Sequence, residues 1–226
     1  MLVAGVLLAV SLTISACSGK SATDLGDPAT VLKTAEQKLA DTSGVNITLN
    51  TSDLPSGVQG IKGASGTVTN APAFDGTLTA VISAGTFPVP VRSVDGKVYA
   101  QIPLTIGWSQ VNPADYHAPD PAQLISADQG LPSILAATTN PKAGKQVRGG
   151  TDNKEILTTY AGSVPGSAVA HLIPGASGDF SASYQIDSSG ELRQAALTGV
   201  FYPGKPSMTY TLDVADYGTT KTVTAP

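Results

Sequence analysis

The residue best suited to covalent chemistry is Cys17, the single cysteine of the chain. It ends the stretch Ile14-Ser15-Ala16-Cys17, and residues 1–12 before it are almost purely apolar. This run is shorter than the ~20 apolar residues of a membrane-spanning helix and is typical of a cleaved signal peptide. Small side chains at positions 15 and 16 admit a peptidase, and a lone thiol has no disulfide partner. The pattern therefore predicts a lipobox, with cleavage before Cys17 and a diacylated thiol.

The lipobox divides the chain into three parts. We expect a signal peptide over residues 1–16, a lipidated cysteine with a flexible tether over residues 17–26, and one folded domain over residues 27–226. Because two acyl chains anchor a protein stably, the plasma membrane is a predicted partner, with the domain on its outer, periplasmic face in the cell envelope. No basic residue precedes Lys20, although signal peptides normally carry one, so we expect the natural start to lie upstream.

Few other residues form a pattern that could carry catalysis. The sequence has no G-x-S-x-G, S-x-x-K or H-E-x-x-H motif and no phosphate-binding glycine loop. His117 and His171 have no second ligand at metal-binding spacing, so surface or packing roles are expected. Asp115, Asp120 and Asp128 could form a carboxylate set, but Asp120 precedes a proline and is better explained as a helix cap. The sequence predicts a protein that is not an enzyme, with no metal and no cofactor.

The charge pattern argues against a nucleic-acid partner. The chain has 13 basic and 17 acidic residues and a net charge of −4, without the clustered Lys and Arg that phosphates require. Charged residues make up 13% of the chain, about half the share of an ordinary soluble domain. Ser, Thr, Gly and Ala take their place, as in many exported proteins.

The apolar periodicity is helical up to about residue 41 and strand-like afterwards. Asp27-Pro28 opens the predicted helix, with the aspartate as cap and the proline in the first turn. Alternation of apolar and polar residues predicts strands at residues 45–50, 77–82, 180–186, 192–201 and 208–214. Short helices with an apolar side are predicted at residues 120–125, 131–137 and 167–173.

Asp95-Gly96 marks the clearest hairpin, because this pair favours the positive φ angles of a two-residue type I′ turn. The predicted pairs across the turn are Ser93 with Val98, Val91 with Ala100, and Val89 with Ile102. One face of the hairpin is then apolar and the other polar. Trp108, the single tryptophan, follows the hairpin. The sequence is compatible with two roles for it, packing in the core and lining a pocket.

Strands joined by hairpins pair antiparallel, and the few helices then pack on one side of the sheet. Helices do not alternate with the strands, which argues against a parallel α/β fold. The sequence therefore predicts an α+β domain.

Several of these segments resemble one family, the LppX and LprG group of mycobacterial lipoproteins. The segments that carry the resemblance are residues 93–100, Trp108-Ser109, Tyr116, residues 120–124 and residues 130–136, in the family's order. Weaker similarity extends from the N-terminal helix to residue 226. The chain departs from the family at Tyr184-Gln185, where a Trp-Ile pair is usual, and at Tyr217-Gly218, where Trp-Gly is common. Both changes keep an aromatic residue.

The resemblance implies a strongly curved antiparallel half-barrel with helices on its concave side, enclosing a large apolar cavity. In the family this cavity takes the acyl chains of lipids or glycolipids such as phosphatidylinositol mannosides. The family helps to deliver them from the plasma membrane toward the outer envelope, and some members act with an efflux transporter.

The resemblance also places Leu78 where a cavity-lining valine lies in LprG-like members. Other apolar residues of the predicted strands and of the predicted helix at 131–137 are further candidates for the cavity wall. They are Ala80, Ile82, Val89, Val91, Val98, Ala100, Ile102, Leu131, Ile134 and Leu135. The alternative for each is that it fills a solid core.

These observations favour a lipid carrier without catalytic activity. A second interpretation is a structural or adhesive envelope lipoprotein with a solid core and no lipid ligand. A third is a hydrolase whose site residues are dispersed in the sequence.

Overall fold

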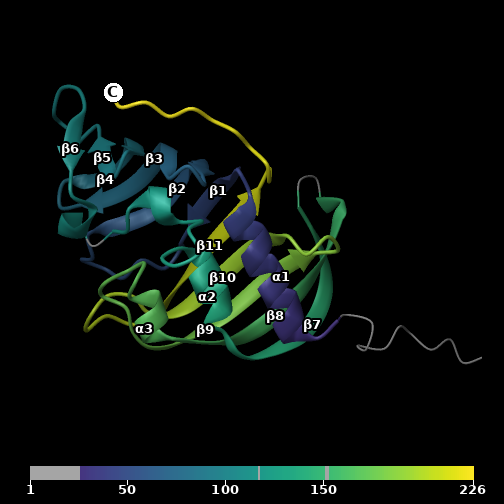
Figure 1. Ribbon diagram of the computed structural model, residues 1–226. Coiled ribbons are helices and arrows are strands. Elements are labelled where there is room, and N and C mark those ends of the chain that lie inside the picture. Colours follow the sequence, from purple (N-terminus) through teal and green to yellow (C-terminus); the bar gives the residue numbers. More distant parts are fainter. Residues whose placement is uncertain (1–25, 117, 151–152) are drawn as a thin grey trace, which may run out of the picture.

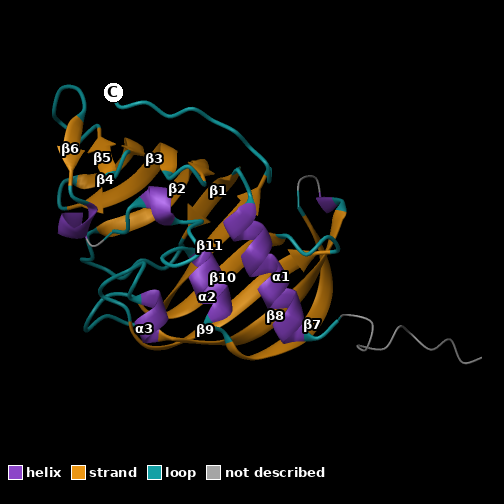
Figure 2. Cartoon of the chain, viewed as in Figure 1, coloured by secondary structure: helices purple, strands orange, loops and turns teal. Residues whose placement is uncertain are grey.

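The computed structural model describes residues 26–116, 118–150 and 153–226, in which one antiparallel sheet curves around a few helices (Figures 1 and 2). The predicted signal peptide, Cys17 and nearly all of the tether lie outside these described residues. Within them, no helix is both long enough and apolar enough to cross a bilayer.

The sheet contains eleven strands in the described part of the chain. They are β1 (Gly44–Asn50), β2 (Gly60–Thr69), β3 (Ala73–Ile82), β4 (Gly85–Val94), β5 (Lys97–Ala100), β6 (Ser109–Val111), β7 (Thr139–Gly149), β8 (Glu155–Pro165), β9 (Ser177–Asp187), β10 (Leu192–Val200) and β11 (Met208–Ala215). The α-helices are α1 (Pro28–Asp41), α2 (Leu131–Ala136) and α3 (Gly166–Val169), and the 3-10 helices are η2 (Pro113–Tyr116) and η3 (Pro121–Gln123).

The strand order is β6-β5-β4-β3-β2-β1-β11-β10-β9-β8-β7, so the first and last strands are neighbours at the centre of the sheet. All neighbouring strands are antiparallel. Strands β6 and β7 form the two edges, and residues 112–138 connect them across the concave side (Figure 1). We call the part of this connection that precedes α2, residues 112–130, the strap. The predicted antiparallel α+β class and the half-barrel that the resemblance implies are both confirmed.

Part of the curvature has a local cause in β2 and β3. Gly66 and Gly76 lie directly opposite each other in the ladder. A Cβ added to either glycine would collide with the partner strand's backbone, at 2.7 Å from Gly76 Cα in the case of Gly66. The Phe74 ring packs beside both glycines. Glycine pairs of this kind let strands approach closely and bend a sheet.

Helix α1 forms as the sequence predicts. Asp27 caps it by accepting a hydrogen bond from the Thr30 N–H at 2.9 Å, and Pro28 occupies the first turn. Its buried face consists of Leu32, Ala35 and Leu39. This face packs on the concave side of the sheet, where α1 contacts α2, β7 and β10 (Figure 2). One half of the half-barrel is thus filled by a helix.

The hairpin of β4 and β5 confirms most of its predicted geometry. Asp95 and Gly96 have φ angles of 53° and 69°, as a type I′ turn requires. The Ser93–Val98 and Val91–Ala100 pairs form as predicted. The Val89–Ile102 pair does not form, because β5 ends at Ala100 and the chain leaves the ladder after a hydrogen bond from the Gln101 N–H to Pro90 O.

Other predicted elements differ from the structure in extent. The third helix ends at Val169 rather than near residue 173, and residues 120–125 hold only the 3-10 turn of η3. Strands β2, β6, β7 and β8 were not predicted. Two of these unpredicted strands, β7 and β8, form one end of the sheet.

Candidate functional site

The strap is fixed over the concave face by one polar contact. Asp120 Oδ1 accepts hydrogen bonds from Ser93 Oγ at 2.6 Å and from the Ala122 N–H at 3.0 Å. The first bond ties the strap to β4, and the second caps η3, so the predicted capping role of Asp120 is confirmed. Pro121 and Ala122 are buried as a result, and η3 contacts β2, β3 and β4. The strap therefore covers β2, β3 and β4.

A first apolar cavity of about 210 Å³ lies between the strap and strands β3 to β5. We call it the hairpin cavity. Its walls are apolar apart from the Tyr116 side chain. They are formed by Ile61, Leu78, Ala80, Ile82, Val89, Val91, Val98, Ala100, Ile102, Pro103, Val111, Pro113, Tyr116, Ala118, Pro119 and Pro121. The structure therefore brings together every strand residue that the sequence analysis named for a cavity wall.

A second apolar cavity of about 150 Å³ lies at the centre of the sheet, and we call it the central cavity. Strands β1, β2, β10 and β11 contribute Ile47, Leu49, Ala64, Ala195, Leu197 and Leu212 to it. The covering side includes Leu124, Leu131, Val169, Leu172 and Ile173. Among the described residues, no charged side chain lines it.

The two cavities share a wall made of Ile61, Leu78, Ala118, Pro119 and Pro121. Each cavity alone is smaller than the ~300 Å³ at which ligand pockets begin, whereas both together exceed that size. The space is thus two adjoining cavities rather than the one large cavity that the resemblance implies. Because Leu78 borders both, its side chain is the natural position at which to divide or fill the space.

Ile134 and Leu135 do not line either cavity. Both are buried in α2, which packs against α1, and they belong to the filled core. Leu131, at the start of α2, does border the central cavity. A covering helix can border the hollow at one end only, because a neighbouring helix fills its other side.

The sequence analysis missed the contributions of β2, β10 and β11 and of the strap. Residues of β2 such as Ile61 and Ala64 lie in a glycine-rich stretch without clear alternation. The alternation of β10 and β11 was recognised, but nothing local distinguishes Leu197 or Leu212 from ordinary core residues. The concentration of prolines at 113, 119 and 121 is the one signal that an irregular strap covers this region.

Two tyrosine hydroxyls lie at the wall of the central cavity. Tyr210 OH donates to Ile61 O at 2.6 Å and lies 3.0 Å from Tyr202 OH. Since the single Tyr210 proton goes to the carbonyl, Tyr202 must donate to Tyr210, and neither hydroxyl keeps a proton for a ligand. Burial, together with the neighbouring Tyr202 hydroxyl, raises the pKa of Tyr210. This wall can therefore accept hydrogen bonds from a ligand but not donate them.

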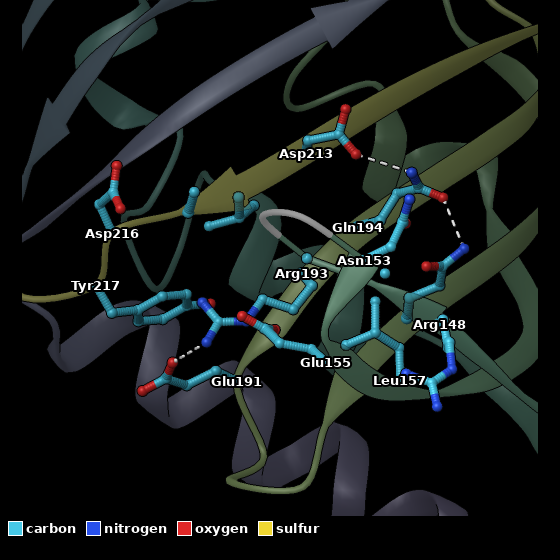
Figure 3. Close-up of a pocket in the computed structure, with 15 residues that line it drawn as sticks. Arg148, Asn153, Glu155, Leu157, Glu191, Arg193, Gln194, Asp213, Asp216 and Tyr217 are labelled. Atoms are coloured by element: carbon cyan, nitrogen blue, oxygen red, sulfur yellow. Dashed lines mark hydrogen bonds and ion pairs between the residues drawn. The ribbon is translucent and has the colours of Figure 1, made fainter.

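A larger cleft of about 760 Å³ differs in character from the apolar cavities (Figure 3). Arg193 lies at its centre, with Nε 3.0 Å from Glu155 and Nη2 2.8 Å from Asp187 and 3.0 Å from Glu191. The Tyr217 ring faces the guanidinium at 5.6 Å, and Gln194 bridges Gln185 and Asp213. The contact between Arg193 Nε and Glu155 Oε2 is an ion pair without a hydrogen bond, and both atoms are buried. With the other pairs it forms a network that joins β8 to β11.

Asp187 illustrates the electrostatics of this network. Burial alone would raise the pKa of its carboxyl group. Hydrogen bonds from Ser189 and from the Glu191 N–H, with the Arg193 guanidinium, outweigh burial and lower the pKa below its ordinary value.

The remaining candidates do not form a site in the described residues. His171 is exposed, and His117 and Cys17 lie outside these residues. Trp108 lines neither apolar cavity; its half-buried ring lies under the Arg92 guanidinium at 5.0 Å, and Arg92 pairs with Asp75. The described residues hold no group of three or more side chains suited to a metal ion.

The fold and the cavities define an α+β half-barrel with a hollow apolar interior. The chain belongs to the LppX_LprAFG lipoprotein family, whose model matches residues 27–224. This membership confirms the resemblance seen in the sequence and indicates a lipoprotein of the cell envelope.

Two solved structures share the fold. LprF from Mycobacterium bovis is 14% identical, with a TM-score of 0.68 over 89% of this chain and 99% of that one. Lipoprotein LppX from Mycobacterium tuberculosis is 20% identical, with a TM-score of 0.64 over 88% of this chain and all of that one (100%). A search of curated proteins gives no match to this chain.

Proposed function

We propose that this protein is a lipid carrier of the cell envelope. Diacylated Cys17 anchors it to the outer face of the plasma membrane, and the two adjoining cavities bind the acyl part of a lipid or glycolipid. The protein then carries this ligand toward the outer envelope, with an efflux transporter as a candidate partner. No step of this role needs a catalytic group.

The observation that carries the proposal is the apolar space left unfilled on the concave side of the sheet, in the hairpin cavity under the strap and in the adjoining central cavity. Protein interiors are normally packed to crystal density, and apolar voids of this size are costly unless something fills them. Each methylene removed from water contributes about 0.8 kcal/mol, so ten buried methylenes contribute roughly 8 kcal/mol. That corresponds to a Kd of about 1 μM before ordering costs. Shape and dryness are enough for tight binding.

The cavities also favour this role over that of a structural envelope lipoprotein without a ligand. A structural protein gains stability from filling its core, and the half of this fold under α1 is filled in that way. The half under the strap is not, although longer side chains at Ala64, Ala80 and Ala100 could fill it.

Native mass spectrometry tests the proposal. The domain lacking Cys17, made in an actinobacterial host, is expected to carry lipid of discrete mass. Leu78→Trp places an indole at the wall shared by both cavities and is expected to abolish this co-purifying lipid.

Ile156→Trp serves as the matched control, because Ile156 is an exposed residue of β8 outside both cavities. This variant should load lipid like the unmodified protein. Unchanged loading of a folded Leu78→Trp variant would show that the ligand does not occupy these cavities, and absence of lipid from the unmodified protein would favour the structural role.

A further inference from the structure

The loop between β5 and β6, residues 101–108, exposes two aliphatic side chains that the fold does not use. Leu104 is 88% exposed and Ile106 is 102% exposed. They are the most exposed large hydrophobic residues of the described chain. Figure 1 shows this loop projecting from the edge of the sheet beside β6. Full exposure of two neighbouring aliphatic residues at a loop tip indicates a contact outside the molecule.

The backbone at Leu104 adds a second, independent observation. Pro103 and Leu104 form a turn closed by hydrogen bonds from the Thr105 N–H and Thr105 Oγ1 to Ile102 O, at 3.1 and 2.9 Å. Leu104 has a φ of 68°, at the turn position where glycine or asparagine is favoured. A leucine there is strained, and because its side chain is exposed, packing does not compensate. The fold alone would favour glycine at this position.

The tip is continuous with the hairpin cavity. Ile102 and Pro103, the residues just before Leu104, line that cavity. Strands β3 and β5 both run antiparallel to β4, so the β3–β4 turn and the 101–108 loop leave the sheet at the same end. Ile82, at the start of that turn, lines the cavity too. One end of the sheet therefore combines the cavity wall with the exposed tip.

The segments of β3, β4, β5 and β6 at this end of the sheet carry no charge. Residues 76–91 and 98–114 contain no Asp, Glu, Lys or Arg, and Asp115 on η2 is the first charge after them. Arg92, which lies over the Trp108 ring, is paired with Asp75. The tip itself, residues 101–108, has no charged residue and can enter an apolar medium without desolvating ions. It also offers a protein partner no electrostatic complementarity, and two side chains are far below the ~800 Å² per partner of a stable protein interface.

We propose that the 101–108 loop docks on a lipid bilayer by inserting Leu104 and Ile106, and so holds the hairpin cavity against the membrane surface. Trp108 would then lie at headgroup level, which tryptophan favours. This contact is separate from the Cys17 anchor. The docking proposal rests on the proposed function only for the reason to hold the cavity against the membrane, which is lipid transfer. Docking itself can be measured without any ligand in the protein.

The chain provides its own reagents for the test. Cys17 is the single cysteine and Trp108 the single tryptophan. The chain from Cys17 onward is coupled through its thiol to a maleimide phospholipid in phosphatidylcholine vesicles, with phosphatidylcholine brominated on its acyl chains as quencher. Trp108 fluorescence is expected to shift to the blue and to be quenched. Neither effect should weaken strongly with added salt, because the inserted side chains are uncharged and Arg92, beside Trp108, is paired with Asp75.

The Leu104→Gly/Ile106→Ser variant should lower the docked population by at least about tenfold, although its tether is unchanged. Because glycine relieves the strain at position 104, this variant should unfold at the same or a higher urea concentration. Val147→Ser, which removes an exposed aliphatic residue of β7, is the matched control and should be quenched like the unmodified chain.

Three results would overturn the docking proposal. Trp108 could remain unquenched in the unmodified tethered chain, or the double variant could be quenched equally. Alternatively, the unmodified chain could self-associate without vesicles in a way that requires Leu104 and Ile106, which would make the tip an interface between copies. Lipid loading measured in parallel separates the two proposals: a quenched chain without lipid contradicts only the carrier function, and a loaded chain without quenching contradicts only the docking.

Discussion

The concave face of the sheet is covered in one way over β7–β10 and in another over β2–β5. Over β7–β10, α1 and α2 press a continuous apolar face onto the strands, and Leu39, Tyr184 and Phe180 are almost completely buried. Over β2–β5 the strap is the cover and the hairpin cavity remains beneath it, while the central cavity adjoins it at β1, β2, β10 and β11. Both halves belong to one sheet with the same antiparallel pairing. Filling therefore depends on the covering element and not on the strands.

Polar contacts follow the same division. In the filled half, Tyr184 OH lies 2.8 Å from Thr138 Oγ1, whose proton goes to Ile134 O, so the tyrosine donates to Thr138. Burial raises the pKa of Tyr184 to about 12. In the hollow half, one bond from Ser93 to Asp120 secures the strap. A fold can keep an apolar space open when a well-packed neighbouring region supplies the stability.

The largest expected contrast comes from truncating one leucine in each half. Leu39→Ala should lower the free energy of unfolding by about 2–5 kcal/mol, because Leu39 has no exposed surface and its removal leaves a new cavity. Leu78→Ala should cost only about 1 kcal/mol, because Leu78 already borders empty space. Urea unfolding of protein refolded without ligand measures both. Equal losses would contradict the division into a filled and a hollow half.

Replacing an alanine by a larger residue should destabilise the filled half and stabilise the hollow half. Ala35→Leu adds volume beneath α1, where no space exists, and should cost about 1–3 kcal/mol. Ala80→Leu adds the same atoms at the wall of the hairpin cavity and should gain about 0.5–1 kcal/mol in the ligand-free protein. The same unfolding experiment applies, and a loss at Ala80 as large as that at Ala35 would mean that the cavity is effectively closed.

The smallest predicted effect concerns acid stability of the polar network in the filled half. The pKa of Asp187 is lower in the folded protein than in the unfolded chain. Its contribution to stability is therefore complete above the unfolded pKa of about 3.9 and is lost as the pH falls through the folded value. Unfolding at fixed urea should become easier below about pH 4.

Asp187→Asn isolates this effect. The amide oxygen can still accept the Ser189 and Glu191 N–H groups that now bind Oδ1, but the charge opposite Arg193 is gone. The variant should be slightly less stable at neutral pH and should depend less on pH in the acid range. An unchanged acid slope would assign the acid sensitivity to other carboxylates.

Helix caps and tight turns were predicted correctly from the sequence, because neighbouring residues determine them. The Asp27 cap and the Asp95-Gly96 turn each fix a conformation within a few residues, and both formed as expected. Strand β7 was missed because its register shifts interrupt any period of two. It also exposes Lys142, Lys145 and Arg148, and charges are typical of an edge that must not pair with another chain.

The cavity was predictable only in part, for a physical reason. Alternation shows which side of a strand is apolar, and so it selected residues such as Val91 and Ala100 that line the hairpin cavity. It cannot show what approaches from the opposite side. Ile134 and Leu135 are as apolar as Leu131, yet α1 fills the space beside α2 and only Leu131 reaches a cavity. A cavity depends on both the strand face and the element that covers it, and the sequence of one segment describes only one of these two surfaces.

The pairing of the first strand with the last has a consequence for the order of folding. Strand β1 pairs with β11, and the Asn46 amide donates to Asp216 at 2.7 Å across 170 residues of chain. Contacts so distant in sequence form slowly, because a long loop must close before they gain anything. Until β11 has been synthesised, β1 and β10 both present open edges that can pair with other chains. A nascent chain that ends before Met208 therefore cannot complete the half-barrel, and its safe maturation depends on the last strand to leave the ribosome.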